Sequence, residues 1–147
     1  MNMAKRFAAG SAGGAAVEMA VIFPMLVLLV IGIVDYGRVF YTSVTVANAA
    51  RAGAEFGSHD PAFSGDTIGM KAFAQLDGQE AGSLGLSARR YCECAGASAS
   101  CTSLCGGGAA PEVFVEVIAS KTLNTLLPYP GLPNQFSITR KATFRSQ

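Results

Sequence analysis

Four cysteines lie close together in one segment and follow the pattern C-x-C-x6-C-x3-C, in a stretch rich in Gly, Ala and Ser. Four sulfurs can bind zinc, but this spacing lacks the paired C-x2-C knuckles that are typical of zinc sites. An even number of closely spaced cysteines is typical of disulfides in an oxidising compartment, which we therefore favour. The four cysteines can form two disulfides in three ways, and the sequence alone does not choose among them. A nested pairing, of Cys92 with Cys105 and Cys94 with Cys101, would suit two facing strands.

The other reactive side chains do not form a known catalytic motif. The single histidine, His59, lies in the segment GSHDP at residues 57–61, which is typical of a turn. The sequence holds no G-x-S-x-G elbow, phosphate loop or metal-binding histidine pair. Cys92 and Cys94 could form a redox pair, but a thioredoxin-like pattern would need a βαβ context, which is missing. We therefore expect no enzyme activity, no cofactor and no metal.

Charge and composition narrow the class of partner. The chain has 147 residues, of which 50% are hydrophobic and 14% charged, and its formal net charge is +1. Lys and Arg are scattered and form no basic stripe, so we do not expect a nucleic acid partner. The length leaves room for one domain beside a membrane segment.

An uncharged apolar segment, MAVIFPMLVLLVIGIV, occupies residues 19–34. Extended back to Gly14, it reaches the ~20 residues that a bilayer-spanning helix needs, and it then includes Glu18. A buried core helix is one alternative, but the rest of so short a chain could hardly surround it. A cleaved secretory signal is another, but the small-residue site at residues 47–49 lies far beyond the apolar segment. We predict a retained transmembrane helix over residues 14–34, kinked at Pro24.

The charges on either side of this helix predict its orientation. Lys5 and Arg6 precede it with no acid among them, whereas Asp35 lies beside Arg38 after it. The positive-inside rule then places the N-terminus in the cytoplasm and residues 35–147 outside. The expected disulfides agree with that compartment.

Glu18 is the unexpected residue of the apolar segment. A carboxylate inside a transmembrane helix costs ~3 kcal/mol on insertion scales, so it usually has a partner and a function. The plain alternative is that Glu18 lies at the membrane interface, where its side chain reaches water.

The order of features around Glu18 resembles a known family. A short basic leader, a small-residue site at Gly13 and Gly14, a glutamate at the fifth position after it and a long apolar helix resemble the signal of type IV pilins. The chain is more closely similar to the TadE-like pseudopilins of tight-adherence (Tad) pilus systems. That resemblance includes Pro24 six residues after Glu18, the DYGR boundary at residues 35–38 and the run AARAGA at residues 49–54. It covers the first third of the chain.

The resemblance implies a processing step and a set of partners. A prepilin peptidase would cut between Gly13 and Gly14 and remove the cytoplasmic leader of residues 1–13. Glu18 would then neutralise the N-terminal amine of a neighbouring subunit, because buried opposite charges are tolerated as a pair. The partners would be other minor pilins, the major pilin, the inner-membrane assembly platform and membrane lipid. The protein would reside in the bacterial inner membrane as a single-pass protein, with entry into the extracellular pilus left open.

Beyond the membrane we expect the same helix to continue over residues 35–56. The residues that fall at helical spacing there include small ones that would allow close packing. These residues would form a stripe along the helix. The stripe could cover the protein's own sheet, pack on another subunit, or do both. Its residues are Phe40, Val44, Ala47, Ala50, Arg51 and Ala54.

The head, residues 57–147, is predicted to hold a short helix and a small antiparallel sheet. Asp66 would cap a helix over residues 67–76 that ends at Gly78, with Ile68, Phe73 and Leu76 on its apolar side. Strands are predicted over residues 84–94, 113–118 and 136–144, with a proline-rich loop at 128–133. The fold class is therefore α+β: a long N-terminal transmembrane helix continues into a small head with about three to four antiparallel strands.

Two functions from different classes follow. The first is a minor pilin or pseudopilin that primes or caps a Tad-type pilus. The alternative is a single-pass, membrane-anchored binding domain outside the cytoplasm that does not enter a pilus. A disulfide-handling envelope enzyme has only the C-x-C pattern in its favour.

Overall fold

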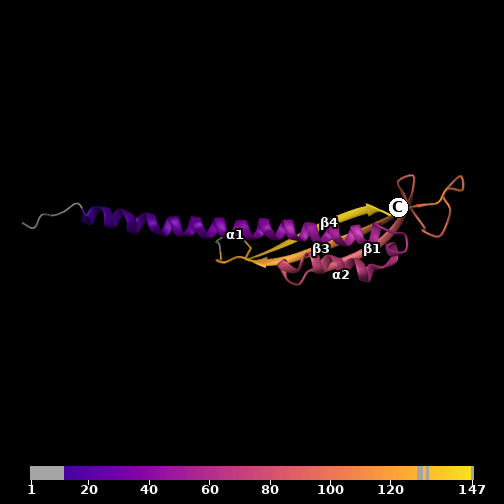
Figure 1. Cartoon of the computed structure of the whole chain (residues 1–147). Helices are drawn as coiled ribbons and strands as arrows, with labels where there is room; N and C mark the ends of the chain where they lie inside the picture. Colours follow the sequence, from indigo (N-terminus) through magenta and orange to yellow (C-terminus); the bar gives the residue numbers. More distant parts are fainter. Residues whose placement is uncertain (1–11, 129–130, 132, 147) are drawn as a thin grey trace, which may run out of the picture. The chain divides into compact units, whose positions relative to one another are not determined.

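The computed structural model describes residues 12–128, 131 and 133–146, and it confirms the predicted α+β class (Figure 1). By its internal contacts the chain divides into two units, one ending at Tyr36 and the other running from Gly37. The helices are α1 (Ala12–Ser58), η1 (Phe63–Gly65), α2 (Thr67–Asp77) and η2 (Gln79–Ala81), and the strands are β1 (Gly85–Cys94), β2 (Ala97–Ala99), β3 (Glu112–Asn124) and β4 (Gln135–Arg145).

The described strands form one antiparallel sheet in the order β2-β1-β3-β4. Three of them match the predicted strands, although β3 runs six residues further than expected. The short strand β2 was not predicted. It pairs with β1 through the two-residue turn Ala95-Gly96, whose φ angles of 51° and 80° are those of a type I′ hairpin turn.

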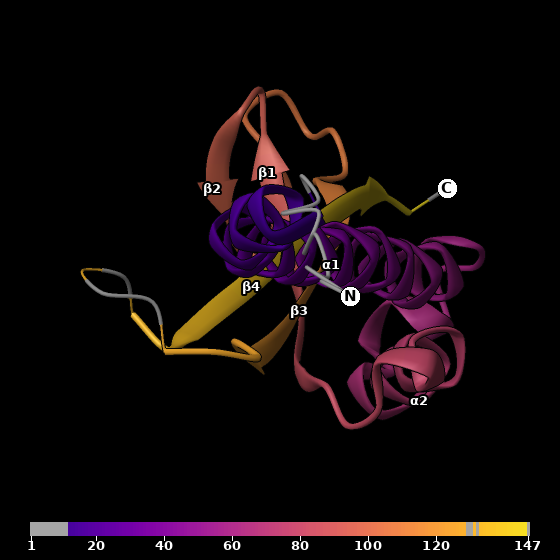
Figure 2. The ribbon, with the colours of Figure 1, turned by 90° about the vertical axis from the view of Figure 1, so that its left-hand side faces the viewer.

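Helices cover one face of this sheet, as Figure 2 shows for α1 and α2. Ala54 of α1 and Met70 and Ala74 of α2 form one core cluster with Val115 and Val117 of β3. A second cluster joins Val46 and Ala50 of α1 to Ala119 of β3 and Ile138 of β4. The two clusters fix the direction of packing: residue numbers fall along α1 as they rise along β3, so these two elements run antiparallel.

Helix α2 begins and ends where the sequence predicts. The side chain of Asp66 accepts a hydrogen bond from the backbone N–H of Gly69 (2.8 Å), and the N–H of Gly78 donates to the carbonyl of Ala74. The cap and the terminal glycine therefore set the bounds of α2.

The predicted apolar side of α2 is wrong. Leu76 is 62% exposed, and Ile68 and Phe73 are exposed as well, whereas Met70 and Ala74 are fully buried. The reason is the close approach of α1. A Cβ atom added at Gly57 would lie 2.5 Å from Cε of Met70, so only small or flexible side chains fit between the two helices.

The other face of the sheet carries charged residues in register. Glu116, at the centre of β3, accepts a hydrogen bond from Nε of Arg89 (2.7 Å) and pairs with Nζ of Lys141 (3.3 Å). Its side chain is only 4% exposed, and it lies on the face of the sheet opposite to the core residues Val115 and Val117. The hydrogen bond from Arg89 lowers the pKa of the Glu116 carboxyl below its usual value, against the opposing effect of burial.

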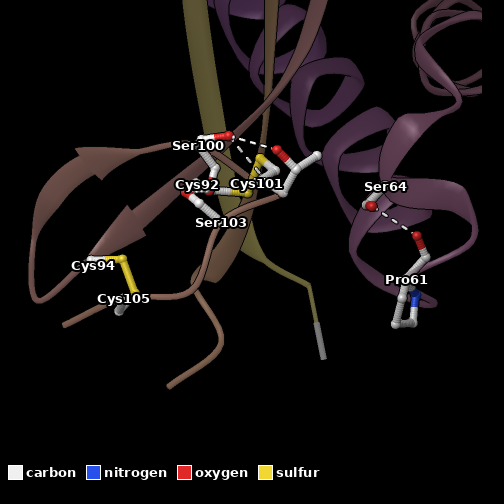
Figure 3. The surroundings of a disulfide bond; sticks show 9 residues. Pro61, Ser64, Cys92, Cys94, Ser100, Cys101, Ser103 and Cys105 are labelled. Atoms are coloured by element: carbon white, nitrogen blue, oxygen red, sulfur yellow. Dashed lines mark hydrogen bonds between the residues drawn. A yellow bond between two sulfur atoms is a disulfide. The ribbon is translucent and has the colours of Figure 1, made fainter. Parts of the chain in front are cut away.

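The cysteines form two disulfides, Cys92–Cys101 and Cys94–Cys105 (Figure 3). The prediction of disulfides is confirmed, and the nested pairing is wrong. A nested arrangement needs a hairpin whose turn lies midway between Cys94 and Cys101. The turn, Ala95-Gly96, instead comes directly after Cys94, so that Cys92 pairs with Ala99 in the ladder and Cys101 comes back beside it. Cys94 is then left for Cys105.

Candidate assembly surface

The first part of α1 is apolar on every side, and its side chains are exposed in the part of the chain that the structure describes. Large side chains such as Val17, Met25 and Leu28 are more than half exposed. Among the described residues, α1 is the one helix long and apolar enough to cross a membrane, with a mean hydropathy of 2.7 over its most apolar window, none of which is buried. A helix that is hydrophobic all round is stable in a bilayer or against other proteins, which argues against the core-helix alternative.

Gly14, Glu18 and Pro24 all lie within α1. The helix begins at Ala12, ahead of the predicted cut between Gly13 and Gly14, and residues 1–11 of the predicted leader lie outside the described residues. Glu18 is exposed, and it stands four residues after Gly14, on the same side of the helix. The helix continues through Pro24, which donates no backbone hydrogen bond there. The kink of α1 at Pro24 stays a prediction.

The small-residue run at residues 49–54 packs against the head of the same chain. Ala49, Ala50 and Ala54 are fully buried. A Cβ atom added at Gly53 would lie 2.6 Å from the carbonyl oxygen of Met70 and 2.9 Å from Cβ of Ala74. Close packing inside the head therefore explains why this run is built from alanine and glycine.

The single stripe predicted along residues 40–54 is wrong, because its residues lie on two different faces. Ala50 and Ala54 are buried in the core. Phe40 is 63% exposed, and Val44 and Arg51 are also exposed. One face of α1 thus serves the head, while the other presents apolar side chains that no part of the described chain covers.

Polar contacts fix α1 to the head on both flanks. The hydroxyl of Tyr41 donates a hydrogen bond to the carboxylate of Glu80 in η2, and this bond raises the pKa of Tyr41. Nη2 of Arg140 on β4 donates to Oγ of Ser43 (2.6 Å). Neither contact was predicted, because no local pattern relates residues so far apart in the chain. Together they set which face of α1 stays outward.

The head offers little that resembles a catalytic centre within its described part. All four cysteines are in disulfides, and no group of three or more His, Cys, Asp or Glu side chains is placed to hold a metal. His59 follows the end of α1, as predicted, and lines a shallow hollow of about 400 Å³ beside Phe56, Phe63 and Phe73. The three phenylalanine rings stack at 5.0 and 4.3 Å between centroids, which fastens η1 and α2 to the end of α1.

These features define a class: a single-pass membrane protein whose apolar N-terminal helix continues into a small α+β head. Residues 13–55 match the family model described as TadE-like protein, which confirms the resemblance drawn from the sequence. The match begins at Gly13, contains Glu18 and Pro24, and ends within the last turn of α1. No curated protein and no solved structure matches the chain at a significant level.

Proposed function

We propose that this protein is a minor pilin of a Tad-type pilus, which helps to prime or cap the filament through its N-terminal helix. The observation that carries the proposal is the coincidence of the TadE-like match with an apolar helix whose side chains are exposed among the described residues. An uncovered apolar helix can pass from lipid to a bundle of similar helices with little change in the environment of its side chains.

Processing by a prepilin peptidase is part of this proposal. A cut between Gly13 and Gly14 would create an amine one helical turn before Glu18. The chain would then carry a positive and a negative charge at one end of an apolar helix, each of which is costly to bury without a partner. Pairing the amine of one subunit with Glu18 of the next would remove that cost and set the axial position of the subunits.

The outward face of α1 supports the same role. Phe40 and Val44 continue the apolar surface beyond residue 36, into the part of the helix that the head holds. In this proposal the partners are other minor pilins, the major pilin and the inner-membrane assembly platform. The protein stands in the inner membrane with its N-terminus in the cytoplasm, and it has no enzyme activity.

The experiment that tests the proposal has two parts. The intact mass of the membrane-resident protein, purified from its native host, should begin at Gly14; a mass that includes Met1 would support a tethered binding domain instead. Glu18→Gln should abolish or strongly reduce piliation. Glu55→Gln is the matched control, because Glu55 is an exposed acid of the same helix within the head, and it should leave piliation unchanged. Normal piliation by Glu18→Gln would contradict the proposed pairing.

A further inference from the structure

Strand β4 lies at the edge of the sheet, so one side of its backbone has no partner strand in the part of the chain that the structure describes. Two hydrogen bonds at the ends of the β3–β4 ladder show which backbone groups lie on that side. The N–H of Ser146 donates to the carbonyl of Val113 (2.9 Å), and the N–H of Thr125 donates to the carbonyl of Asn134 (3.0 Å). In an antiparallel ladder such hydrogen-bonded pairs recur at every second residue. The backbone groups that point away from β3 are therefore those of the odd-numbered residues, among them Ser137, Thr139, Lys141 and Thr143.

This edge lacks the features that usually prevent a strand from pairing with another chain, which are proline, a bulge or a protecting charge. Residues 135–145 contain no proline, and their register against β3 runs without a bulge. Lys141 and Arg145 are charged, but both reach across the sheet toward β3 and away from the edge. Nζ of Lys141 lies 3.3 Å from Glu116, and Nη1 of Arg145 lies 2.8 Å from Glu112. The edge of β4 is thus open to an additional strand.

Arg140 places a positive charge directly at this edge. Its Nη1 donates to the outward carbonyl of Thr139 (3.2 Å), and its Nη2 donates to Oγ of Ser43 on α1 (2.6 Å). Both of these acceptors are neutral, and the Thr139 carbonyl keeps a second lone pair for another donor. All the charged residues of β4 are cations, namely Arg140, Lys141 and Arg145. The charge along the edge therefore favours an acidic partner strand.

The two faces of β4 differ in polarity, and a partner strand must match both. Ile138 and Ala142 pack into the core beneath the helices, and Phe144 lies on the same face and is 39% exposed. The opposite face carries the polar side chains of Thr139 and Lys141. Because side chains of neighbouring strands meet on the same face, the best partner has acidic residues on one face and apolar residues on the other.

We propose that the outer edge of β4 is a docking site for an extended acidic segment of another protein, which joins the sheet as an additional strand. The backbone of this segment pairs with residues 137–143, its acidic side chains lie beside Lys141 and Arg145, and its apolar side chains cover Phe144. The β4 strand of a second copy fits less well, because it would bring cations to cations. The strand lies outside the TadE-like match of residues 13–55, and the site does not depend on how α1 is used.

The backbone amides of Thr139 and Thr143 report directly on this docking, because both point outward. The full chain, with ¹⁵N-labelled threonine, is kept in detergent, and exchange of these amides in heavy water is followed by NMR. The probe is the synthetic peptide acetyl-Thr-Glu-Val-Glu-Val-Glu-Thr-amide, and its matched control has lysine in place of each glutamate. We expect the acidic peptide at saturation to slow the exchange of both amides by at least about tenfold, and the basic peptide to leave it unchanged.

Two substitutions at one position separate backbone pairing from other modes of binding. Thr139→Pro removes an outward N–H and no hydrogen bond to β3, so it should weaken the binding of the acidic peptide about fivefold, measured at Thr143. Thr139→Val keeps the N–H and should bind as the wild type does. Circular dichroism checks that each head is folded. If Thr139→Pro does not fold, Arg140→Gln decides, since loss of its charge should also weaken the protection of Thr143.

Three results would overturn the proposal. If the acidic peptide protects neither amide, the edge of β4 is not a docking site. If both peptides protect them equally, the partner is not selected by its acidic side chains. If protection without peptide rises with the concentration of the protein, a second copy covers the edge instead.

Discussion

One helix, α1, is built in two different ways along its length. In residues 14–34 its side chains are large and aliphatic, and the described chain covers none of its most apolar window. In residues 37–58 one face consists mainly of small residues, and on this face Val46, Ala49, Ala50 and Ala54 are fully buried in the head. The two parts join without a break in hydrogen bonding, because both sequences are compatible with a helix.

The difference shows which residues carry information about partners. Small residues in the second part are explained by packing within the chain, so they need no partner to account for them. The first part has no such explanation, and neither have Phe40 and Val44 on the outward face of the second. Substitutions in the second part should therefore unfold the head, while those in the first should leave the head intact and change what it associates with.

The sharpest test of this contrast compares two glycines of α1. Gly53→Leu should destabilise the head by at least about 3 kcal/mol, because its side chain would overlap the backbone of Met70 and the Cβ of Ala74. Gly32→Leu is the matched control, since a Cβ there meets nothing within 4 Å. Thermal unfolding of the full chain in detergent, followed by circular dichroism, measures both. A large effect at Gly32 would contradict this contrast between the two parts of α1.

Within the head, Met70→Ala should cost about 2–4 kcal/mol, because it leaves a cavity between α1 and α2. Leu76→Ala on the same helix should change the free energy of unfolding by less than about 0.5 kcal/mol, since Leu76 is exposed. Urea titration of the full chain in detergent compares the two. If Leu76→Ala destabilised the head more than Met70→Ala, the apolar side of α2 predicted from the sequence would be right.

Removing one disulfide should cost about 2–3 kcal/mol, the value expected for closing a loop of some ten residues. The Cys92→Ala, Cys101→Ala double variant should lose more than the Cys94→Ala, Cys105→Ala variant, because Cys92 is buried in the head and Cys94 is only half-buried. Unfolding temperatures of the two variants under non-reducing conditions test the order. Neither should alter membrane insertion of residues 14–34.

The smallest expected effect concerns pH. Glu116→Gln should cost about 1.5 kcal/mol at neutral pH, because it weakens hydrogen bonds to a charged group. The folded-state pKa of Glu116 is lowered, so its contribution is complete above the unfolded value of about 4.3 and is lost as the pH falls through the folded-state pKa. Wild type and variant should therefore converge in strong acid when unfolding is measured at several pH values.

Local signals predicted the bounds of the elements well and their faces poorly. Asp66 and Gly78 mark the ends of α2 because capping is a property of adjacent residues. Which side of α2 is buried depends instead on Gly53 and Gly57, some fifteen residues earlier, which bring α1 so close that Met70 and Ala74 fit and a larger Phe73 does not. The prediction from hydrophobicity chose the larger side chains, because it did not include the close approach of α1 and α2.

The disulfide pairing could not be predicted from the sequence for a similar reason. Strand β2 contains only three small residues, and its turn, Ala95-Gly96, lacks the Asn or Asp that usually marks a type I′ turn. Without that turn the register of Cys101 against Cys92 is not defined. The TadE-like segment, by contrast, could be recognised from the sequence, because Gly13, Glu18 and Pro24 follow one another along one helix.

The antiparallel packing of α1 on the sheet has a consequence for the order of folding. Val46 is buried against Ala119 and Ile138, which are about 70 and about 90 residues further along the chain. Contacts so distant in sequence form late, because a long stretch of chain must be ordered before they form. The β1–β2 hairpin and its cystines are local, so we expect them to form first. Docking of α1 then completes the head, and until that step Val46, Ala50 and Ala54 are open to proteases and chaperones.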